Sequence, residues 1–426
     1  MGLVRSAGPT ILRRAGGARE AFPPAGAVTS DSPPYTPRTM TEELPIVELS
    51  GDYLPSGPWL YSRLCREPRQ AIEAGALVEL QDADGRFFGH GLYNPNSDIR
   101  VRILSTGKRT DLDKPRQFLL RQIAAADRLR KKTLRLPEVT EAYRMVHAEG
   151  DDLPGLIVDR FGDVIVCEHH SLGFWLWRAD VTWALKELYP DSTVYHRVPK
   201  SALRSEGFDV PEPEDNPEII VKEHGVGFVV KPAAGHKTGF FCDQRDNRQL
   251  IASLARGGDV LDLCCNSGGF ALHAKAAGAT RVSAVDLDEK VLDRAIRSAK
   301  YNDLEIRWTH GDIFEVLRRE QPRARTVILD PHKIVRDRNR MDQGLATYGD
   351  MNTLALGAVK PGGLLATFSC SGAVDLATFV GTVFRAARRA ERGVRLLRVL
   401  EAGPDHPQRP DFTRSRYLKG LLLAVD

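Results

Sequence analysis

The chain has 426 residues, of which 42% are hydrophobic and 27% are charged. This length is too great for one ordinary hydrophobic core and predicts two or three domains. The composition is that of a globular protein in water, and the sequence contains no run of about 18 consecutive apolar residues that could cross a membrane. The formal charge of +4 is small, so a basic surface must be sought in individual segments.

The first 44 residues differ in composition from the rest of the chain. They carry five arginines, many Ala, Gly and Pro, and no lysine. An arginine-rich leader is typical of a transit peptide, but Glu20, Asp31 and two pairs of prolines argue against one. We expect a disordered extension over residues 1–44, with Met40 as an alternative start.

Short apolar runs separated by turns follow over residues 45–106. Residues 76–80 and 87–92 are predicted strands on either side of a turn at 82–85. Residues 99–104 alternate apolar and basic side chains, which is the period of a half-exposed strand. This segment is expected to form a small β-barrel.

Residues 107–235 are predicted to form a central α+β domain that opens with a basic helix over 112–132. Ten Lys/Arg stand against four Asp/Glu across 106–140. A phosphate-binding face and an ordinary solvated helix face explain this cluster equally well. Another helix is expected near 174–188, and strands near 143–147, 155–159, 163–168, 193–196 and 218–231, with a proline-rich loop at 211–217.

Strands and helices alternate strictly over the last predicted domain, residues 236–426. Such alternation predicts an α/β fold whose mostly parallel sheet is covered by helices on both faces. The strands are expected near 259–263, 281–286, 305–310, 326–330, 363–369, 394–401 and 418–424.

The first of these strands runs through a glycine-containing turn into a helix, which is typical of a cofactor site. The turn lacks the G-x-G-x-x-G pattern, so a dinucleotide is not favoured. Acidic residues end three successive strands: Asp262 to receive an amino group, Asp286 to take ribose hydroxyls and Asp312 to accept from an adenine amine. We expect S-adenosylmethionine to bind at Asp262, Cys264, Gly268, Gly269, Asp286, Leu287 and Asp312, although a single such acid could merely cap a helix.

The next two strands end in Asp330-Pro331-His332 and in Ser369-Cys370-Ser371, and they point into the same crevice. Thiolate addition at C6 of a pyrimidine makes C5 nucleophilic, so Cys370 is a candidate nucleophile. Asp330 could hold the N3–N4 edge of cytosine, because carboxylates accept from its exocyclic amine. The simpler alternative for Cys370 is a buried packing residue, and packing is the role expected for the side chains of Cys264 and Cys265.

Longer motifs recur in a fixed order along the chain: GLYNPNS at 91–97, EGDDLPGLIVDR at 149–160, KTGFFCDQRDNR at 237–248, KPGG at 360–363, SCS at 369–371 and RYLKG at 416–420. In these motifs the chain resembles the bacterial large-subunit (23S) ribosomal RNA cytosine-C5 methyltransferases of the RlmI type, from about residue 45 onward. The resemblance implies a PUA-like RNA-binding domain over 45–106, a Rossmann-like methyltransferase domain, and a place for Gln244 near the cofactor. One departure is that His332 stands where the family usually has the second proline of Asp-Pro-Pro.

Further expectations concern partners and alternatives. Ribosomal RNA is the expected partner, with Pro331, His332, Arg336, Arg338 and Arg340 among its contacts. The six cysteines lack paired metal-ligand spacing, so we expect free thiols, no metal and a cytoplasmic location. A homodimer stays open. Two other functions also stay open. One is RNA N-methylation, which needs no thiol. The other is a catalytically impaired RNA-binding or ribosome-assembly protein, which the departure at His332 favours.

Overall fold

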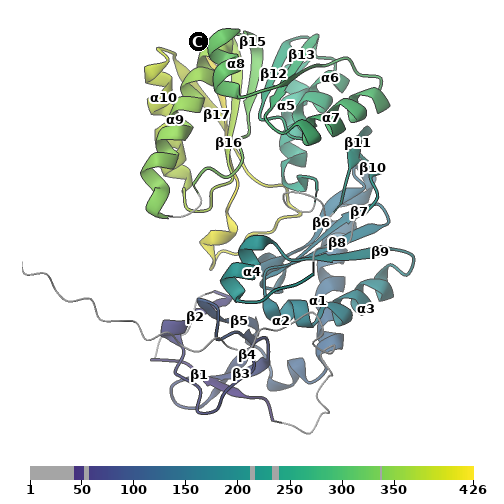
Figure 1. Ribbon diagram of the computed structural model, residues 1–426, viewed down its shortest axis with the longest axis vertical. Helices are drawn as coiled ribbons and strands as arrows, with labels where there is room; N and C mark the ends of the chain where they lie inside the picture. The colour runs from purple at the N-terminus through teal and green to yellow at the C-terminus, as the bar shows by residue number, and fades with distance from the viewer. Residues whose placement is uncertain (1–42, 52–56, 212–215, 233–238, 336–337) are drawn as a thin grey trace, which may run out of the picture.

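The computed structural model describes residues 43–51, 57–211, 216–232, 239–335 and 338–426. The expected extension, most of the proline-rich loop, Lys237, Thr238 and Arg336 lie outside or largely outside this range. Four sheets arrange the described chain in three bodies, stacked from the N-terminal domain through a central domain to a C-terminal domain (Figure 1). No helix among the described residues is long and apolar enough to span a bilayer.

The N-terminal domain is a five-stranded sheet in the order β1-β3-β4-β5-β2. Its inward side chains, among them Val47, Leu60, Val78 and Val101, form a separate small core. The expected strands at 76–80, 87–92 and 99–104 are confirmed within two residues. The strands are β1 (Ile46–Glu48), β2 (Trp59–Tyr61), β3 (Leu77–Gln81), β4 (Phe87–Tyr93) and β5 (Ile99–Ser105).

The central domain packs helices against a four-stranded sheet in the order β6-β7-β8-β9. The basic helix α1 (Pro115–Arg128) begins at a proline, which suits the first helical position, and ends in a π turn at Leu129–Thr133. The other helices are α2 (Leu172–Leu176), α3 (Arg178–Leu188) and α4 (Lys200–Glu206). The strands are β6 (Ala142–His147), β7 (Leu156–Phe161), β8 (Val164–His169) and β9 (Thr193–Arg197).

One expectation in this region is wrong. The single strand expected near 218–231 is a hairpin of β10 (Ile219–Glu223) and β11 (Val226–Val230). His224 and Gly225 between them both have positive φ angles, 48° and 82°. Two such residues make the tight turn that matches the twist of an antiparallel pair.

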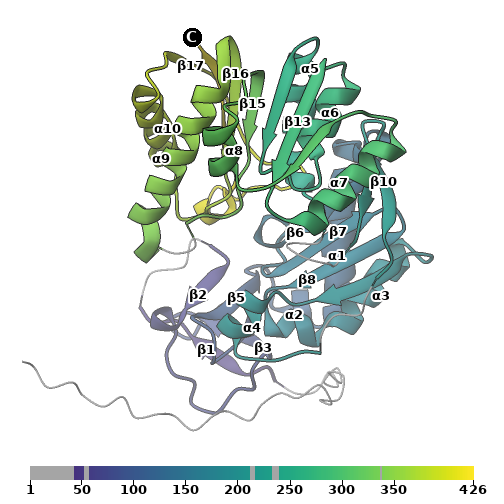
Figure 2. The same cartoon turned by 45° about the horizontal axis from the view of Figure 1, so that its top comes forward.

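The C-terminal domain is a seven-stranded sheet in the order β14-β13-β12-β15-β16-β18-β17, in which only β18 runs against its neighbours. Its strands are β12 (Asp259–Leu263), β13 (Arg281–Asp286), β14 (Arg307–His310), β15 (Ala324–Leu329), β16 (Val359–Ser369), β17 (Val394–Leu400) and β18 (Lys419–Val425). Helices cover both faces (Figure 2), so the mostly parallel α/β fold predicted from the alternation is confirmed. They are α5 (Arg245–Ala255), α6 (Gly269–Ala276) and α7 (Glu289–Tyr301) on one side, and α8 (Ile313–Arg319), α9 (Met341–Ala358) and α10 (Leu376–Arg389) on the other.

The segment between β17 and β18, residues 401–418, leaves the sheet and reaches the other two domains (the lower yellow loop of Figure 1). The carbonyl oxygen of Asp405 accepts from the Arg130 guanidinium at 2.7 Å. A Cβ atom on Gly150 would lie 2.2 Å from the carbonyl oxygen of Pro407, so the central domain needs glycine there. Phe412 contacts Trp59 of the N-terminal domain, with ring centroids 4.8 Å apart. This C-terminal segment therefore joins all three domains.

Candidate functional site

The parallel strands of the C-terminal domain end along one edge of the sheet. The register pairs Leu263 of β12 with Val285 of β13 and with Leu329 of β15, and Leu329 in turn with Thr367 of β16. Side chains at such strand ends share one crevice in open α/β sheets. The structure therefore brings together the five strand-end residues singled out in the sequence, which are Asp262, Asp286, Asp312, Asp330 and Cys370.

The turn between β12 and α6 is tightly wound. Cys264, Asn266 and Gly268 have positive φ angles of 62°, 49° and 75°. A Cβ atom on Gly268 would lie 2.6 Å from Cη2 of Trp308, and one on Gly269 would lie 2.9 Å from Cδ of Arg248. The two glycines are thus explained by packing, since they let the turn come close to β14 and α5.

Asp262 is completely buried at the end of β12. Its Oδ2 accepts from the main-chain N–H of Ala271 at 3.0 Å, whereas its Oδ1 has no hydrogen-bond partner among the described residues. Burial raises the pKa of this carboxyl well above its usual range, and the neighbouring Asp330 and Asp286 raise it further. An unsatisfied buried carboxyl beside other acids is suited to a positively charged group.

The next two acids are held by main-chain N–H groups. Asp286 is half-buried and accepts from Asn266 N at 2.7 Å and from Asp288 N at 2.9 Å. Asp312 caps α8 by accepting from Phe314 N at 2.6 Å. Helix capping is therefore one role of Asp312. Beside Asp286, the apolar side chain of Leu287 is 68% exposed, which leaves an open apolar face at this edge.

The pKa of the Cys264 thiol shows that these acids lie close together. Burial raises its pKa far above the ordinary value, and four carboxylates push in the same direction: Asp286, Asp330, Asp262 and Asp312. All four predicted acids thus act on one atom of the turn. Their summed negative potential favours a ligand that carries positive charge.

Asp330 is held by Gln244, which lies just before α5. Nε2 of Gln244 donates to Oδ2 of Asp330 at 3.0 Å, and Oε1 of Gln244 accepts from Nδ2 of Asn247 at 2.7 Å. Gln244 and Asn247 are both buried, while Asp330 is half-buried. The orientation of the Asp330 carboxylate is therefore set by a hydrogen-bonded chain of side chains.

Cys370 follows β16 between two fully buried serines. Ser369 Oγ donates to the Tyr348 hydroxyl at 2.9 Å, and Ser371 Oγ lies 3.0 Å from that hydroxyl and accepts from Val335 N at 3.1 Å. Successive side chains of an extended chain point to opposite sides. The anchored serines accordingly turn the half-buried thiol toward Pro331, whose carbonyl oxygen lies 4.0 Å from Sγ.

A buried cation adjoins this thiol. Lys419 at the start of β18 pairs with Ser369, and its Nζ donates to the carbonyl oxygens of Ser371 and Tyr417, both at 2.7 Å. Burial lowers the pKa of Lys419 to about 8, although the negative charges of Cys370 and Asp375 act in the opposite direction. Sequence reasoning assigned no role to Lys419, and its place in the RYLKG motif was the available signal.

Comparison with known proteins identifies the family. A PUA-like domain model matches residues 56–106, and a methyltransferase domain model matches residues 260–344. Ribosomal RNA large subunit methyltransferase I of Pseudoalteromonas atlantica is 34% identical over 86% of this chain and 95% of its own length, and that of Shewanella frigidimarina is 34% identical with the same coverage. The chain belongs to the ribosomal RNA large subunit methyltransferase I family. The resemblance found in the sequence motifs is thereby confirmed.

Solved structures agree with this fold. SMU.776, assigned as a methyltransferase and solved with SAH, superposes with a TM-score of 0.74 at 18% identity, over 90% of this chain and 100% of its own. A protein of Streptococcus mutans assigned as a SAM-dependent methyltransferase gives a TM-score of 0.73 at 18% identity, over 89% and 100%. The fold predicted for this chain is therefore confirmed. It has a PUA-like domain before a Rossmann-like domain.

The expected substrate contacts are only partly described. Pro331 is buried and His332 is exposed at the mouth of the crevice. Arg336 lies outside the described residues, and for Arg338 the structure describes the backbone alone, at the start of a 3-10 turn at Arg338–Arg340. All six cysteines are free thiols. No cluster of His, Cys, Asp or Glu able to hold a metal occurs within the described ranges.

The basic segment 106–140 is less free to bind phosphate than its composition indicated. Arg130 is fully buried and pairs with Asp151, while Arg116 pairs with Asp180 and Arg135 with Glu138. Asp151 and Asp180 lie outside this segment, whereas Glu138 lies within it, three residues after Arg135. Lys114, Arg128 and Lys132 are exposed and are candidates to meet a phosphate.

Proposed function

We propose that this protein transfers a methyl group from S-adenosylmethionine to C5 of a cytosine in large-subunit ribosomal RNA, with Cys370 as the nucleophile. The observation that carries the proposal is the Cys370 thiol, oriented by two anchored serines, next to a buried lysine and across from Asp330. Membership of a ribosomal RNA large subunit methyltransferase family supports the substrate class. A cytoplasmic location belongs to the same proposal, because free thiols persist in a reducing compartment.

The cofactor is S-adenosylmethionine, and the residues at the strand ends fit it. The orphaned Oδ1 of Asp262 would accept from its ammonium group, Asp286 from its ribose hydroxyls and Asp312 from its adenine amine, with Leu287 against the adenine face. The main chain at Cys264, Gly268 and Gly269 would border it. When bound, it supplies an electrophilic methyl group on a positively charged sulfur.

Asp330 orients the target base in this proposal. One of its oxygens accepts from the exocyclic N4 amine of cytosine, while the other is held by Gln244. Gln244 thereby acts as a positioning residue for Asp330, although the sequence resemblance placed it near the cofactor. Pro331 and the exposed His332 border the base, and Arg336 and Arg338 are proposed to contact the RNA backbone.

Covalent addition makes the carbon reactive. Sγ of Cys370 bonds to C6 as the C5–C6 double bond opens, and C5 would then take the methyl group, whose bond to the cofactor sulfur breaks and leaves its electron pair on that sulfur as a neutral thioether. A water molecule or a basic side chain in the crevice then takes the proton from C5, the electrons of that C–H bond re-form the C5–C6 double bond, and Sγ departs as thiolate. The Lys419 ammonium stabilises the thiolate before attack and after elimination, because opposite charge favours the ionised form.

A substrate with 5-fluorocytosine tests this mechanism, because fluorine at C5 cannot leave as a proton. Wild-type enzyme should remain covalently attached to such RNA, and the adduct should be visible as a band of reduced mobility in denaturing gels. Cys370→Ala should lose both the adduct and at least about 10³-fold in turnover, with unchanged affinity for S-adenosylmethionine by calorimetry. Cys65→Ala, in the N-terminal domain, is the matched control and should behave as wild type.

The loop Asp330-Pro331-His332 supports a second candidate, because loops of the Asp-Pro-Pro kind also serve amino groups. In that case the same crevice methylates a nitrogen of the RNA, and Asp330 serves an amino group without any thiol. Turnover by Cys370→Ala close to the wild-type rate, with no trapped RNA, would replace the first proposal by this one. Cofactor binding without turnover on any ribosomal RNA would point instead to a role in ribosome assembly.

A further inference from the structure

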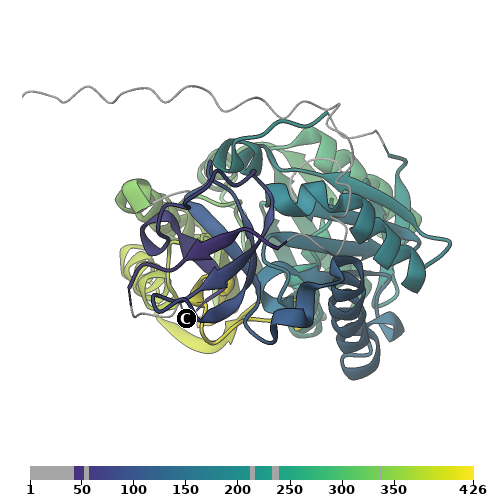
Figure 3. The same ribbon diagram turned by 90° about the horizontal axis from the view of Figure 1, so that it is seen from below.

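A cavity of about 450 Å³ lies where the three domains meet, away from the methyl-transfer crevice. Strands β2 and β5 of the PUA-like domain form one wall, and α4 of the central domain and the C-terminal segment form the others. Figure 3 shows the molecule from below, with the strands of the PUA-like domain in front. Its lining residues include Trp59, Tyr61, Asn96, Arg204 and Arg414.

Two aromatic rings form one wall of this junction cavity. Trp59 and Tyr61 are two positions apart on β2, so their side chains lie on the same face of the strand. Their ring centroids are 6.4 Å apart with planes at 78°. The Arg414 guanidinium lies 5.7 Å from the Trp59 centroid and 5.8 Å from that of Tyr61. A planar cation beside two aromatic faces is an arrangement on which nucleobases stack.

The Trp59 ring is fixed before any ligand arrives. Its Nε1 donates to Oε1 of Glu149 at 2.9 Å, Phe412 packs against it, and the Arg102 guanidinium lies 5.6 Å from its centroid. Arg102 is in turn paired with the buried Glu206 at 3.0 Å. A preorganised wall loses little conformational entropy when a ligand binds, which favours affinity.

The cations at the mouth of the junction cavity are available to a ligand. Arg204 and Arg414 are exposed and have no ion-pair partner in the part of the chain that the structure describes. One exposed acid, Asp98, also lines the cavity, and with the Asn96 amide it offers acceptors and donors for base edges. The charge and hydrogen-bonding groups therefore match a nucleotide rather than an apolar ligand.

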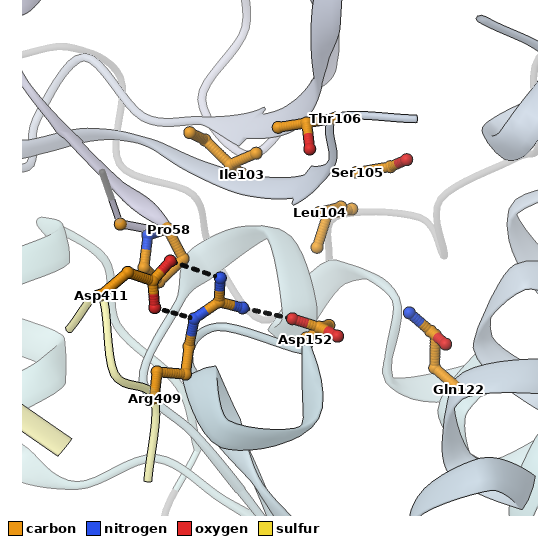
Figure 4. A pocket seen from close by; sticks show the side chains of 10 residues that line it. Pro58, Ile103, Leu104, Ser105, Thr106, Gln122, Asp152, Arg409 and Asp411 are labelled. Carbon is orange, nitrogen blue, oxygen red and sulfur yellow. Dashed lines mark hydrogen bonds and ion pairs between the residues drawn. The ribbon is translucent and has the colours of Figure 1, made fainter. Parts of the chain in front are cut away.

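A second hollow beside the same C-terminal segment lacks these features. It measures about 330 Å³, has no aromatic ring among its lining residues, and its arginine is already engaged. Arg409 there is held by Asp411 on one side and by Asp152 on the other (Figure 4). The contrast shows that stacking faces and an available guanidinium are particular to the junction cavity.

We propose that the junction cavity binds an unpaired nucleobase of the RNA substrate, which stacks on the face of one of the two rings, Trp59 or Tyr61, and meets the other ring with its edge, with Arg414 beside it and Arg204 on the adjoining phosphate. The proposal rests on the proposed action on RNA and specifies where a nucleotide other than the target is held. Arg414 stands only five residues before Lys419 in the chain. A nucleotide bound here thus contacts the segment that leads directly to the Cys370 thiol and draws the PUA-like and methyltransferase domains onto one RNA.

Photocross-linking tests the contact without requiring catalysis. A single-stranded RNA oligonucleotide that carries 4-thiouridine is irradiated with full-length Cys370→Ala protein, and the linked peptides are identified by mass spectrometry. Links to the peptides of Trp59, Tyr61 or Arg414 are expected. Because this protein cannot form the covalent C6 adduct, failure of the carbon-methylation mechanism leaves the result readable.

Affinity for large-subunit ribosomal RNA transcript supplies the second measurement. Trp59→Ala and Tyr61→Ala should both weaken RNA binding, by about 5- to 150-fold for the ring on which the base stacks and by less for the ring that meets its edge, and both should raise KM with kcat unchanged. Trp59→Phe should restore most of the affinity, which separates stacking from folding. Gln122→Ala, in the hollow of Figure 4, is the control and should bind as wild type. Wild-type RNA affinity in both alanine variants, together with no cross-link at these peptides, would overturn the proposal.

Discussion

Buried charged side chains occur in two regions: the crevice at the sheet edge, and the junction of the central and C-terminal domains, which is distinct from the junction cavity. The two regions differ in how the buried charge is compensated. At the junction three buried acids each have a close cationic partner. Three bidentate pairs, Arg144–Asp159, Arg245–Asp405 and Arg248–Glu223, have N–O distances from 2.7 to 3.1 Å. At the sheet edge, main-chain N–H groups donate to Asp262, Asp286 and Asp312, and the Gln244 amide donates to Asp330.

The pKa values of the two regions differ accordingly. Burial alone would raise the pKa of Glu223, but Arg248 and His273 bring it down to about 2. Burial raises the pKa of Asp262, and its acidic neighbours raise it more. Charges matched within the chain stabilise the fold, whereas charges left unmatched prepare a site for an external cation. The comparison therefore separates architecture from function without reference to any relative.

The largest effect is expected when one partner of a buried ion pair is removed. Asp405→Ala leaves the buried Arg245 guanidinium without its bidentate partner and removes the acceptor for Arg144 N. Loss of one member of a buried pair costs about 3–5 kcal/mol. The midpoint of urea unfolding should fall accordingly, and Asp84→Ala, in an exposed pair with Arg86, should leave it unchanged. An unchanged midpoint for Asp405→Ala would contradict the structural role given to the junction.

Substitution of an acid at the sheet edge should weaken cofactor binding more than it destabilises the fold. Asp286→Ala removes the acceptor proposed for ribose hydroxyls and should weaken S-adenosylmethionine binding by about 1–3 kcal/mol in calorimetry. Asp288→Ala, two residues on, removes the cap of α7, whose N–H donors are those of Lys290 and Val291. That control should cost about 1 kcal/mol of stability and leave the affinity intact. Equal losses of affinity in the two variants would make Asp286 structural as well.

Lys419 provides a test of the charged pair at the thiol. Its pKa of about 8 lies below the usual value for lysine, so the folded protein loses this proton as the pH rises through about 8. The groups that act on it are Cys370, Asp375 and Lys333. If the ammonium stabilises the thiolate, kcat should fall above about pH 8 in wild type.

Lys419→Arg should move that fall to higher pH, because a guanidinium keeps its charge. Lys419→Met should lower kcat at neutral pH by about tenfold for each unit by which the thiol pKa rises. A pH profile with the same descending limb in all three proteins would remove Lys419 from the mechanism. The sign for folding is the reverse of the usual lysine case: burial of this group opposes folding below about pH 8, and the penalty is relieved as the pH rises toward 10.5.

The smallest effect concerns the basic segment. Because Arg130 is paired with Asp151, the phosphate contacts of this segment are expected from its exposed cations, among them Arg128 and Lys132. Arg128→Gln with Lys132→Gln should reduce the slope of log Kd against log salt by no more than about 2, at roughly one unit for each phosphate contact. Asp113→Asn, an exposed acid of the same segment, should not lower the slope. A slope unchanged by the double substitution would place the phosphate contacts on other elements.

Local patterns in the sequence determined most of the fold. The alternation of apolar strands with helices predicted the α/β domain and its seven strands, because strand and helix periods are local properties. The motifs from GLYNPNS to RYLKG predicted the family, and strand ends predicted which acids and which thiol face the crevice. The domain boundaries at 44, 106 and 235 and the assignments of Arg336 and Arg338 stay predictions.

Only the tertiary structure decided which charges are matched. Arg130 and Asp405 are 275 positions apart, and Gln244 and Asp330 are 86 apart, so no spacing rule connects them. The same holds for Lys419 beside Cys370 and for Arg414 over Trp59, which the return of the C-terminal segment brings together. Hydrophobic periodicity and turn propensity depend on residues that are close together in the sequence. The compensation of a buried charge depends instead on which groups the folded chain brings within a few ångströms of it.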